Sequence, residues 1–260
     1  MRRYLVIAAT LVVIGVNAAA TLLPINGMAT GKLSALYPTG FTPAGWVFSI
    51  WSLVYLGLVA YGIHAALLGG ATRGLNSRMQ MRLRSIELPY LVSAIANTAW
   101  IFLWHYRFVG ASVLAMLVLL GSLLVIYVQL RRQPAVSGLQ RVIVDGTFSL
   151  YLGWITTATF VNLGAWFFDL GQWPFEHTRD EWAIITVVLA GAIYVAAGIW
   201  TADWVYTSVF VWAALGIAYR GSGVTEAVAI AAGTGAAGVA LVTALNLFRS
   251  LFGRRRSLLA

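Results

Sequence analysis

Long apolar runs with almost no charged side chains are the feature that most limits how this chain can fold. About 20 helical residues cross a hydrocarbon core of roughly 30 Å, and the runs reach that length. They lack the strict alternation of outer-membrane barrel strands and are about twice as long as such strands. Since 60% of the residues are apolar and only 10% are charged, no sizeable soluble domain can be cut from the sequence. The sequence therefore predicts an all-α membrane protein.

Eight membrane spans account for the runs. The 38 residues from Trp182 to Tyr219 are too long for one crossing, so we place a tight turn at Thr201-Ala202-Asp203. The first run follows Met1-Arg2-Arg3 and resembles a signal peptide, but it is long enough to span, and we predict that it is retained. The predicted spans are Tyr4–Leu23, Ala44–Leu68, Ile86–Tyr106, Phe108–Leu130, Val142–Phe167, Trp182–Trp200, Trp204–Tyr219 and Glu226–Phe248.

The placement of basic residues predicts that both termini are cytoplasmic. Cytoplasmic segments carry an excess of Arg and Lys. With eight spans and the N-terminus inside, thirteen basic residues lie inside and four outside, whereas seven spans would divide them almost evenly. The inner set is Arg2, Arg3, Arg73, Arg78, Arg82, Arg84, Arg131, Arg132, Arg141, Arg249, Arg254, Arg255 and Arg256, and the outer set is Lys32, Arg107, Arg179 and Arg220.

Familiar catalytic and cofactor-binding patterns are missing from the sequence. There is no cysteine, which excludes thiolate catalysis, iron–sulfur clusters and cysteine-based zinc sites. His64 and His105 fall near opposite ends of their spans, too far apart to share one iron, and we interpret both as interfacial. The net charge of +9 reflects cytoplasmic loops, so we expect no nucleic-acid partner. The sequence predicts neither an enzyme nor a bound metal or cofactor.

Aromatic side chains form stripes on three of the predicted helices. Trp51 and Tyr55 lie one turn apart on the second span. On the third span the stripe is Asn97, Trp100 and Trp104, and on the fifth it is Tyr151, Trp154, Ala158 and Asn162. Other tryptophans, Trp200 among them, suit the aromatic belt at a membrane interface.

Two interpretations of the stripes stay open. Each amide could bond across helices within an ordinary packed core. Alternatively, the stripes could line an apolar pocket with a few polar anchors. Their similar depth beneath the long first loop, Ile25–Thr42, favours a cavity with a lid.

These residues also carry a family resemblance. The chain resembles the TspO/MBR family, also called translocator protein or tryptophan-rich sensory protein, whose members form five-helix bundles. The second-helix pattern P-x-G-W-V-F occurs at residues 43–48 and is followed by Trp51 and Tyr55. The third-helix N-x-x-W is Asn97 and Trp100, and the fifth-helix Y-x-x-W-x-x-x-A-x-x-x-N begins at Tyr151. The resemblance covers roughly residues 4–166.

The chain departs from the family pattern at three places. Trp46 and Trp51 are five residues apart where the family usually has six. Ser93 and Leu150 replace a glutamine and a proline of the family motifs. The resemblance therefore indicates a divergent branch with a C-terminal extension. It implies a TspO-like five-helix bundle over residues 1–168, an extracytoplasmic loop over 169–181, three additional helices over 182–248 and a basic cytoplasmic tail over 249–260.

The resemblance implies a receptor or transporter-like protein of the inner (plasma) membrane that binds a planar apolar ligand, such as a tetrapyrrole or a sterol. The lipid bilayer and this ligand are the expected partners, and a homodimer is compatible with the sequence. A secondary transporter that uses all eight helices, or a membrane enzyme acting on porphyrin-like substrates, is the alternative. The candidate ligand-binding residues are Trp46, Trp51, Tyr55, Asn97, Trp100, Trp104, Tyr151, Trp154, Ala158 and Asn162.

Overall fold

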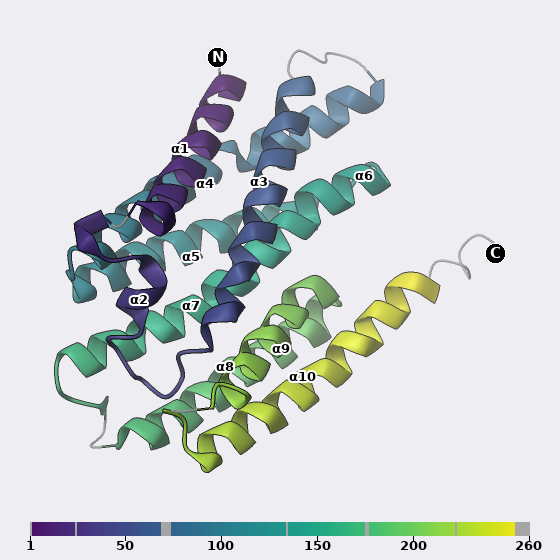
Figure 1. Ribbon diagram of the computed structural model, residues 1–260. Coiled ribbons are helices and arrows are strands. Elements are labelled where there is room, and N and C mark those ends of the chain that lie inside the picture. The colour runs from purple at the N-terminus through teal and green to yellow at the C-terminus, as the bar shows by residue number, and fades with distance from the viewer. Residues whose placement is uncertain are drawn as a thin grey trace. The chain divides into compact units, whose positions relative to one another are not determined.

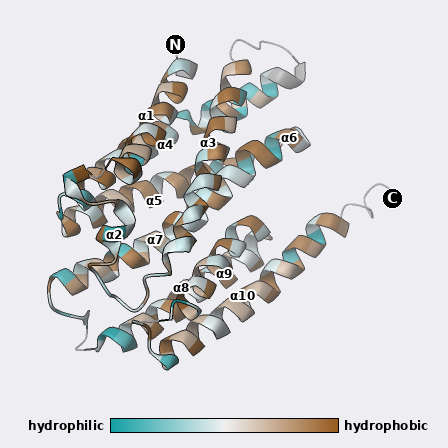
Figure 2. Cartoon of the chain, in the orientation of Figure 1, coloured by the Kyte–Doolittle hydropathy of each residue, from teal (hydrophilic) through white to brown (hydrophobic). Residues whose placement is uncertain are grey.

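A computed structural model of the chain describes residues 2–23, 25–68, 74–133, 135–174, 177–221 and 223–252. Within these ranges the regular secondary structure is entirely helical (Figure 1). Colouring by hydropathy shows mostly hydrophobic residues along the helices and hydrophilic residues near several helix ends (Figure 2). The prediction of an all-α fold is confirmed.

The chain divides into two compact units. Unit 1 comprises Met1–Leu36 and Ser49–Ile155, and unit 2 comprises Tyr37–Phe48 and Thr156–Ala260. The boundaries fall inside the first loop and inside helix α7, rather than in the loop after α7. The predicted domain limits at residues 168 and 182 stay a prediction.

Unit 1 is built from helices that cross or approach one another through their apolar faces. α1 packs against α3 and α4, and α4 packs along α5. A short link joins α4 to α5, and Arg107 in this link has a positive φ of 61°. The elements are α1 (Arg2–Leu22), η1 (Ile25–Gly27), α2 (Thr30–Ser34), α3 (Ile50–Leu67), α4 (Gly74–His105), α5 (Val109–Arg132), α6 (Gly138–Gln140), the π-helical η3 (Arg141–Gly146) and the first half of α7 (Thr147–Asp169).

Unit 2 contains a three-helix bundle, the second half of α7 and the segment Tyr37–Phe48 with most of η2 (Gly45–Ser49). In the bundle, α8 (Arg179–Thr201), α9 (Trp204–Ala218) and α10 (Glu226–Phe252) pack against one another. α8 begins with a capping box, in which Thr178 and Glu181 satisfy backbone N–H groups at the helix start.

Six described helical segments are long and apolar enough to span a membrane: Tyr4–Leu22, Gly45–Leu67, Ser77–His105, Val109–Arg132, Arg179–Thr201 and Glu226–Phe252. Trp204–Ala218 is a shorter apolar helix. α7 is long enough but carries threonines and Asn162, which lower its hydropathy, and no residue from Thr147 to Phe167 is exposed. The chain is therefore a multi-pass membrane protein, while the count of eight crossings stays a prediction.

The predicted break between the sixth and seventh spans is confirmed. α8 ends at Thr201, and Ala202 adopts a left-handed conformation with φ of 52°. Asp203 then caps α9, because its side chain accepts hydrogen bonds from the backbone N–H groups of Val205 and Tyr206 at 3.0 and 3.1 Å. A tight turn thus separates two helices that hydropathy alone would merge.

The helix that carries the third predicted span begins earlier than the predicted start of that span. We placed it at Ile86, but α4 begins at Gly74 and runs for 32 residues, about 48 Å at 1.5 Å per residue. The segment around Arg78, Arg82 and Arg84 is helical because its arginines, methionines and leucines are good helix formers. We had assigned these arginines to a loop. Arg73 and the tail residues 253–260, which include Arg254, Arg255 and Arg256, lie outside the described residues.

The topology gives a first test. A fusion of alkaline phosphatase after α10 should be inactive in a bacterial host, because the distribution of basic residues predicts a cytoplasmic C-terminus. A fusion of green fluorescent protein at the same place should fluoresce. Phosphatase activity after α10 would mean an odd number of crossings.

Candidate functional site

Trp51 is the centre of an aromatic cluster in unit 1. Its ring stacks on Tyr55, with centroids 5.3 Å apart and an interplanar angle of 16°. Its ring also meets Tyr151 and Trp154 edge to face, at 5.9 and 6.1 Å. The two α7 rings are buried, whereas Trp51 and Tyr55 are half-buried. The second and fifth predicted spans therefore meet through the residues that the sequence singled out.

An amide chain ties three helices together beside this cluster. Asn17 of α1 donates to the Oδ1 atom of Asn97 in α4 at 2.7 Å, and the Nδ2 atom of Asn97 donates to the hydroxyl of Tyr151 at 3.1 Å. Asn97 is completely buried. The amide is thus engaged on both sides, which fixes the relative height of α1, α4 and α7.

Trp100 and Trp104 continue the α4 stripe toward the first loop. Their rings stack on each other with centroids 6.1 Å apart, and both are buried. One residue further, His105 holds the start of that loop. Its Nδ1 atom lies 3.1 Å from the carbonyl of Ile25, its Nε2 atom lies 2.9 Å from the hydroxyl of Thr30, and its own carbonyl accepts from Asn26 at 2.9 Å.

Three candidate residues belong to unit 2. Asn162 and Ala158 lie on the second half of α7, where Asn162 is buried and Ala158 is half-buried. Trp46 is 47% exposed and meets Trp212 of α9 edge to face at 4.6 Å. The structure therefore brings five candidate residues into one contact network: Trp51, Tyr55, Asn97, Tyr151 and Trp154. Trp100 and Trp104 lie on the same face of α4 as Asn97. Trp46 instead packs against Trp212 of α9.

Helix α9 holds residues 42–47, which run from the last residue of the first loop into the start of η2. The backbone N–H of Ala44 donates to the carbonyl of Gly216 at 3.0 Å, and the indole N–H of Trp212 donates to the carbonyl of Val47 at 3.0 Å. The guanidinium of Arg220 donates to the carbonyl of Thr42 at 3.0 Å. Burial and the nearby charge of Arg179 lower the pKa of Arg220. These contacts assign a structural task to α9 that the sequence did not reveal.

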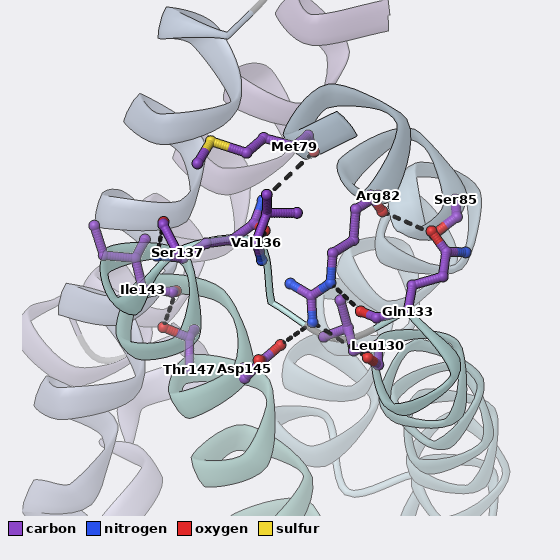
Figure 3. Close-up of polar contacts among 11 residues, drawn as sticks. Met79, Arg82, Ser85, Leu130, Gln133, Val136, Ser137, Ile143, Asp145 and Thr147 are labelled. Atoms are coloured by element: carbon purple, nitrogen blue, oxygen red, sulfur yellow. Dashed lines mark hydrogen bonds and ion pairs between the residues drawn. The ribbon is translucent and has the colours of Figure 1, made fainter. Parts of the chain in front are cut away.

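A polar network, called here the closing network, joins the first part of α4 to the end of α5 and to η3 (Figure 3). The buried Arg82 of α4 forms an ion pair with Asp145 in η3 and donates to the carbonyls of Gln133 and Leu130, which lie at the end of α5. In the sequence, the nearest basic residue to Asp145 is Arg141, one helical turn earlier. The partner is instead Arg82, 63 residues away along the chain.

Sequence reasoning missed Asn17 as well as these contacts. A lone amide inside the apolar first span was the available signal, because buried polar groups in membrane helices find partners on other helices. His105, interpreted as interfacial, is 2% exposed and fully engaged with the first loop. No spacing rule predicts such a contact, because it depends on the path of an irregular loop.

These features define a multi-pass, all-helical membrane protein with an aromatic and amide cluster inside one of its helical units. Residues 3–245 match the family model described as TSPO-like protein. The chain therefore belongs to the TSPO-like family, as the motifs had indicated. The match continues beyond residue 166 and includes α8, α9 and most of α10. No curated protein and no solved structure matches this chain.

The ion pair in Figure 3 gives a stability prediction. Arg82→Gln should lower the free energy of unfolding by about 3 kcal/mol, because it leaves a carboxylate and two carbonyls without their buried partner. Thermal unfolding of the purified protein in detergent measures the effect. Arg84→Gln, two residues away and exposed, should change stability by less than about 0.5 kcal/mol. Equal effects of the two changes would contradict the ion pair.

The contact between α9 and the first loop gives another prediction. A Cβ atom at Gly216 would overlap the side chain of Val47, so Gly216→Ala should loosen residues 42–47 and raise their amide hydrogen exchange. Gly233→Ala is the matched control, because a Cβ atom there meets nothing within 4 Å. Gly233→Ala should leave exchange in residues 42–47 unchanged. Unchanged exchange in Gly216→Ala as well would show that α9 does not hold the loop.

Proposed function

We propose that the chain binds a planar apolar ligand, such as a tetrapyrrole or a sterol, at the aromatic cluster around Trp51. The observation that carries the proposal is the coincidence of this cluster with the motif residues of the TSPO-like family. Trp51 and Tyr55 are half-buried, so part of their surface is not covered by protein. Aromatic faces of this kind stack on flat ring systems.

The polar part of the site supports orientation of the ligand. Asn97 is already bonded to Tyr151 on one side and to Asn17 on the other. These bonds therefore fix the helix that carries Trp154 and the helix that carries the Trp100–Trp104 pair. Under this proposal a ligand lies against Trp51 and Tyr55, and the buried residues behind them keep these two rings in place.

The proposed role is that of a receptor or transporter-like protein of the plasma membrane, without catalysis. Binding needs only a fixed apolar surface and a route from the bilayer, and both suit the aromatic cluster of a membrane helix bundle. The first loop is the proposed lid over this site. Its start is held by His105, which lies on the same helix as Asn97 and Trp100.

Titration of the protein with protoporphyrin IX, haem and a sterol, followed by tryptophan fluorescence, tests the proposal. Trp51→Leu keeps apolar bulk but removes the stacking face. Affinity for the ligand that binds should fall by about 0.5–1.5 kcal/mol, a few-fold to about tenfold. Trp200→Leu, at an 84% exposed position, should leave affinity unchanged. If none of the three compounds quenches the fluorescence saturably, or if both variants bind as the parent protein does, the proposed site is wrong.

A further inference from the structure

Of the buried polar atoms in unit 1 that have no hydrogen-bond partner among the described residues, three belong to side chains on the facing parts of α3 and α4. They are the hydroxyl oxygen of Tyr61, the Nε2 atom of His64 and the Oε2 atom of Glu87. Leaving a buried polar group unpaired destabilises the folded state, so native proteins rarely leave several together. Such atoms mark a place where a ligand, an ion or water completes the structure.

The three residues face each other across two helices. Tyr61 and His64 are three residues apart on α3, and Glu87 and Tyr90 are three residues apart on α4, so each pair shares a helix face. The rings of Tyr61 and Tyr90 meet with centroids 5.0 Å apart, which brings the two faces together. Glu87 lies close enough to Tyr61 to act on it electrostatically.

Two neighbouring polar side chains have partners, although the Nη1 atom of Arg82 has none among the described residues. The hydroxyl of Tyr90 bonds to the hydroxyl of Thr10 on α1 at 2.6 Å. Arg82 is engaged by Asp145 and two carbonyls. The amide chain through Asn97 begins seven residues beyond Tyr90, about 10 Å along the helix axis. The three atoms therefore belong neither to the closing network nor to the aromatic cluster.

The chemistry of the cluster favours a cation. Within the ranges that the structure describes, Glu87 forms no ion pair, and Arg84 one turn earlier is exposed. A carboxylate oxygen, a phenol oxygen and an imidazole nitrogen can all accept hydrogen bonds from an ammonium group. The rings of Tyr61, Tyr90 and Phe148, packed edge to face at 5.0–5.9 Å, add the negative faces that attract cations.

We propose that Tyr61, His64 and Glu87 form a second binding site in unit 1, which takes a small cationic group such as the ammonium of an organic amine. The site lies nearer the Gly74 end of α4 than the aromatic cluster does. It uses different residues, so binding of an amine and binding of a planar apolar ligand can fail independently.

Cysteine accessibility tests this proposal sharply, because the chain contains no cysteine of its own. His64→Cys, in protein reconstituted in lipid nanodiscs, would be treated with two water-soluble methanethiosulfonates. One carries a trimethylammonium group and the other a sulfonate. The matched control is Ile63→Cys at the same depth, whose parent side chain is 56% exposed and faces away from the cluster. Tyr61→Cys serves as reporter if His64→Cys does not fold.

The expected result is that the cationic reagent modifies His64→Cys about tenfold faster than the anionic one, since a nearby carboxylate acts on the two reagents in opposite directions. Glu87→Gln on the same background should abolish this preference. Methylammonium chloride should slow the reaction relative to sodium chloride at equal ionic strength. Ile63→Cys should show neither preference nor protection.

Several outcomes would overturn the proposal. Equal rates with the two reagents, or a preference that survives Glu87→Gln, would show that no carboxylate-lined cation site exists. Reaction at His64→Cys with charge preference but without protection by methylammonium would show a hydrated space that binds no amine. In that case the unpaired atoms are satisfied by water alone.

Discussion

Polar groups inside a bilayer must find their partners within the protein, and this requirement organises both units. The backbone satisfies it by forming helices, because no water is present to bond an open strand edge or an irregular segment. The side chains satisfy it by bonding from one helix to another. Asn97 joins α1 to α7, and in unit 2 the hydroxyls of Thr157 and Tyr194 join α7 to α8 at 2.9 Å. Each such bond fixes the register of two helices, because sliding one helix along the other would break the bond.

Helix α7 shows how far this requirement shapes a single element. Its hydroxyl and amide side chains lower its hydropathy below that of the six long apolar segments, yet none of its residues between Thr147 and Phe167 is exposed. Thr156 and Thr157 bond to tyrosines of unit 2, while Tyr151 bonds to Asn97 in unit 1. A helix that is surrounded by protein can carry polar groups because it has no lipid-facing side on which they would be exposed to hydrocarbon.

The sequence predicted the helices, and it predicted which aromatic residues share a helix face, because both depend on local spacing. The turn at Ala202 followed from length alone, since 38 residues exceed one crossing. The contact of Trp51 with Trp154 was anticipated from two stripes of similar depth. The pairing of Arg82 with Asp145 was not predictable in this way, because it joins residues far apart in sequence. The same holds for the contacts of Trp212 and Arg220 with the first loop, which depend on backbone carbonyls that no motif encodes.

Buried polar groups with hydrogen-bond partners and those without them therefore have different roles in our two proposals. The amide of Asn97 has partners on two other helices, so it needs no ligand to satisfy it. Among the described residues, the unpaired atoms of Tyr61, His64 and Glu87 have no partner, so a polar group bound there would supply the missing hydrogen bonds. A flat apolar ligand gains little from such atoms, and a small cation gains little from the stacked rings of Trp51 and Tyr55. The two proposed sites of unit 1 would therefore take chemically different molecules.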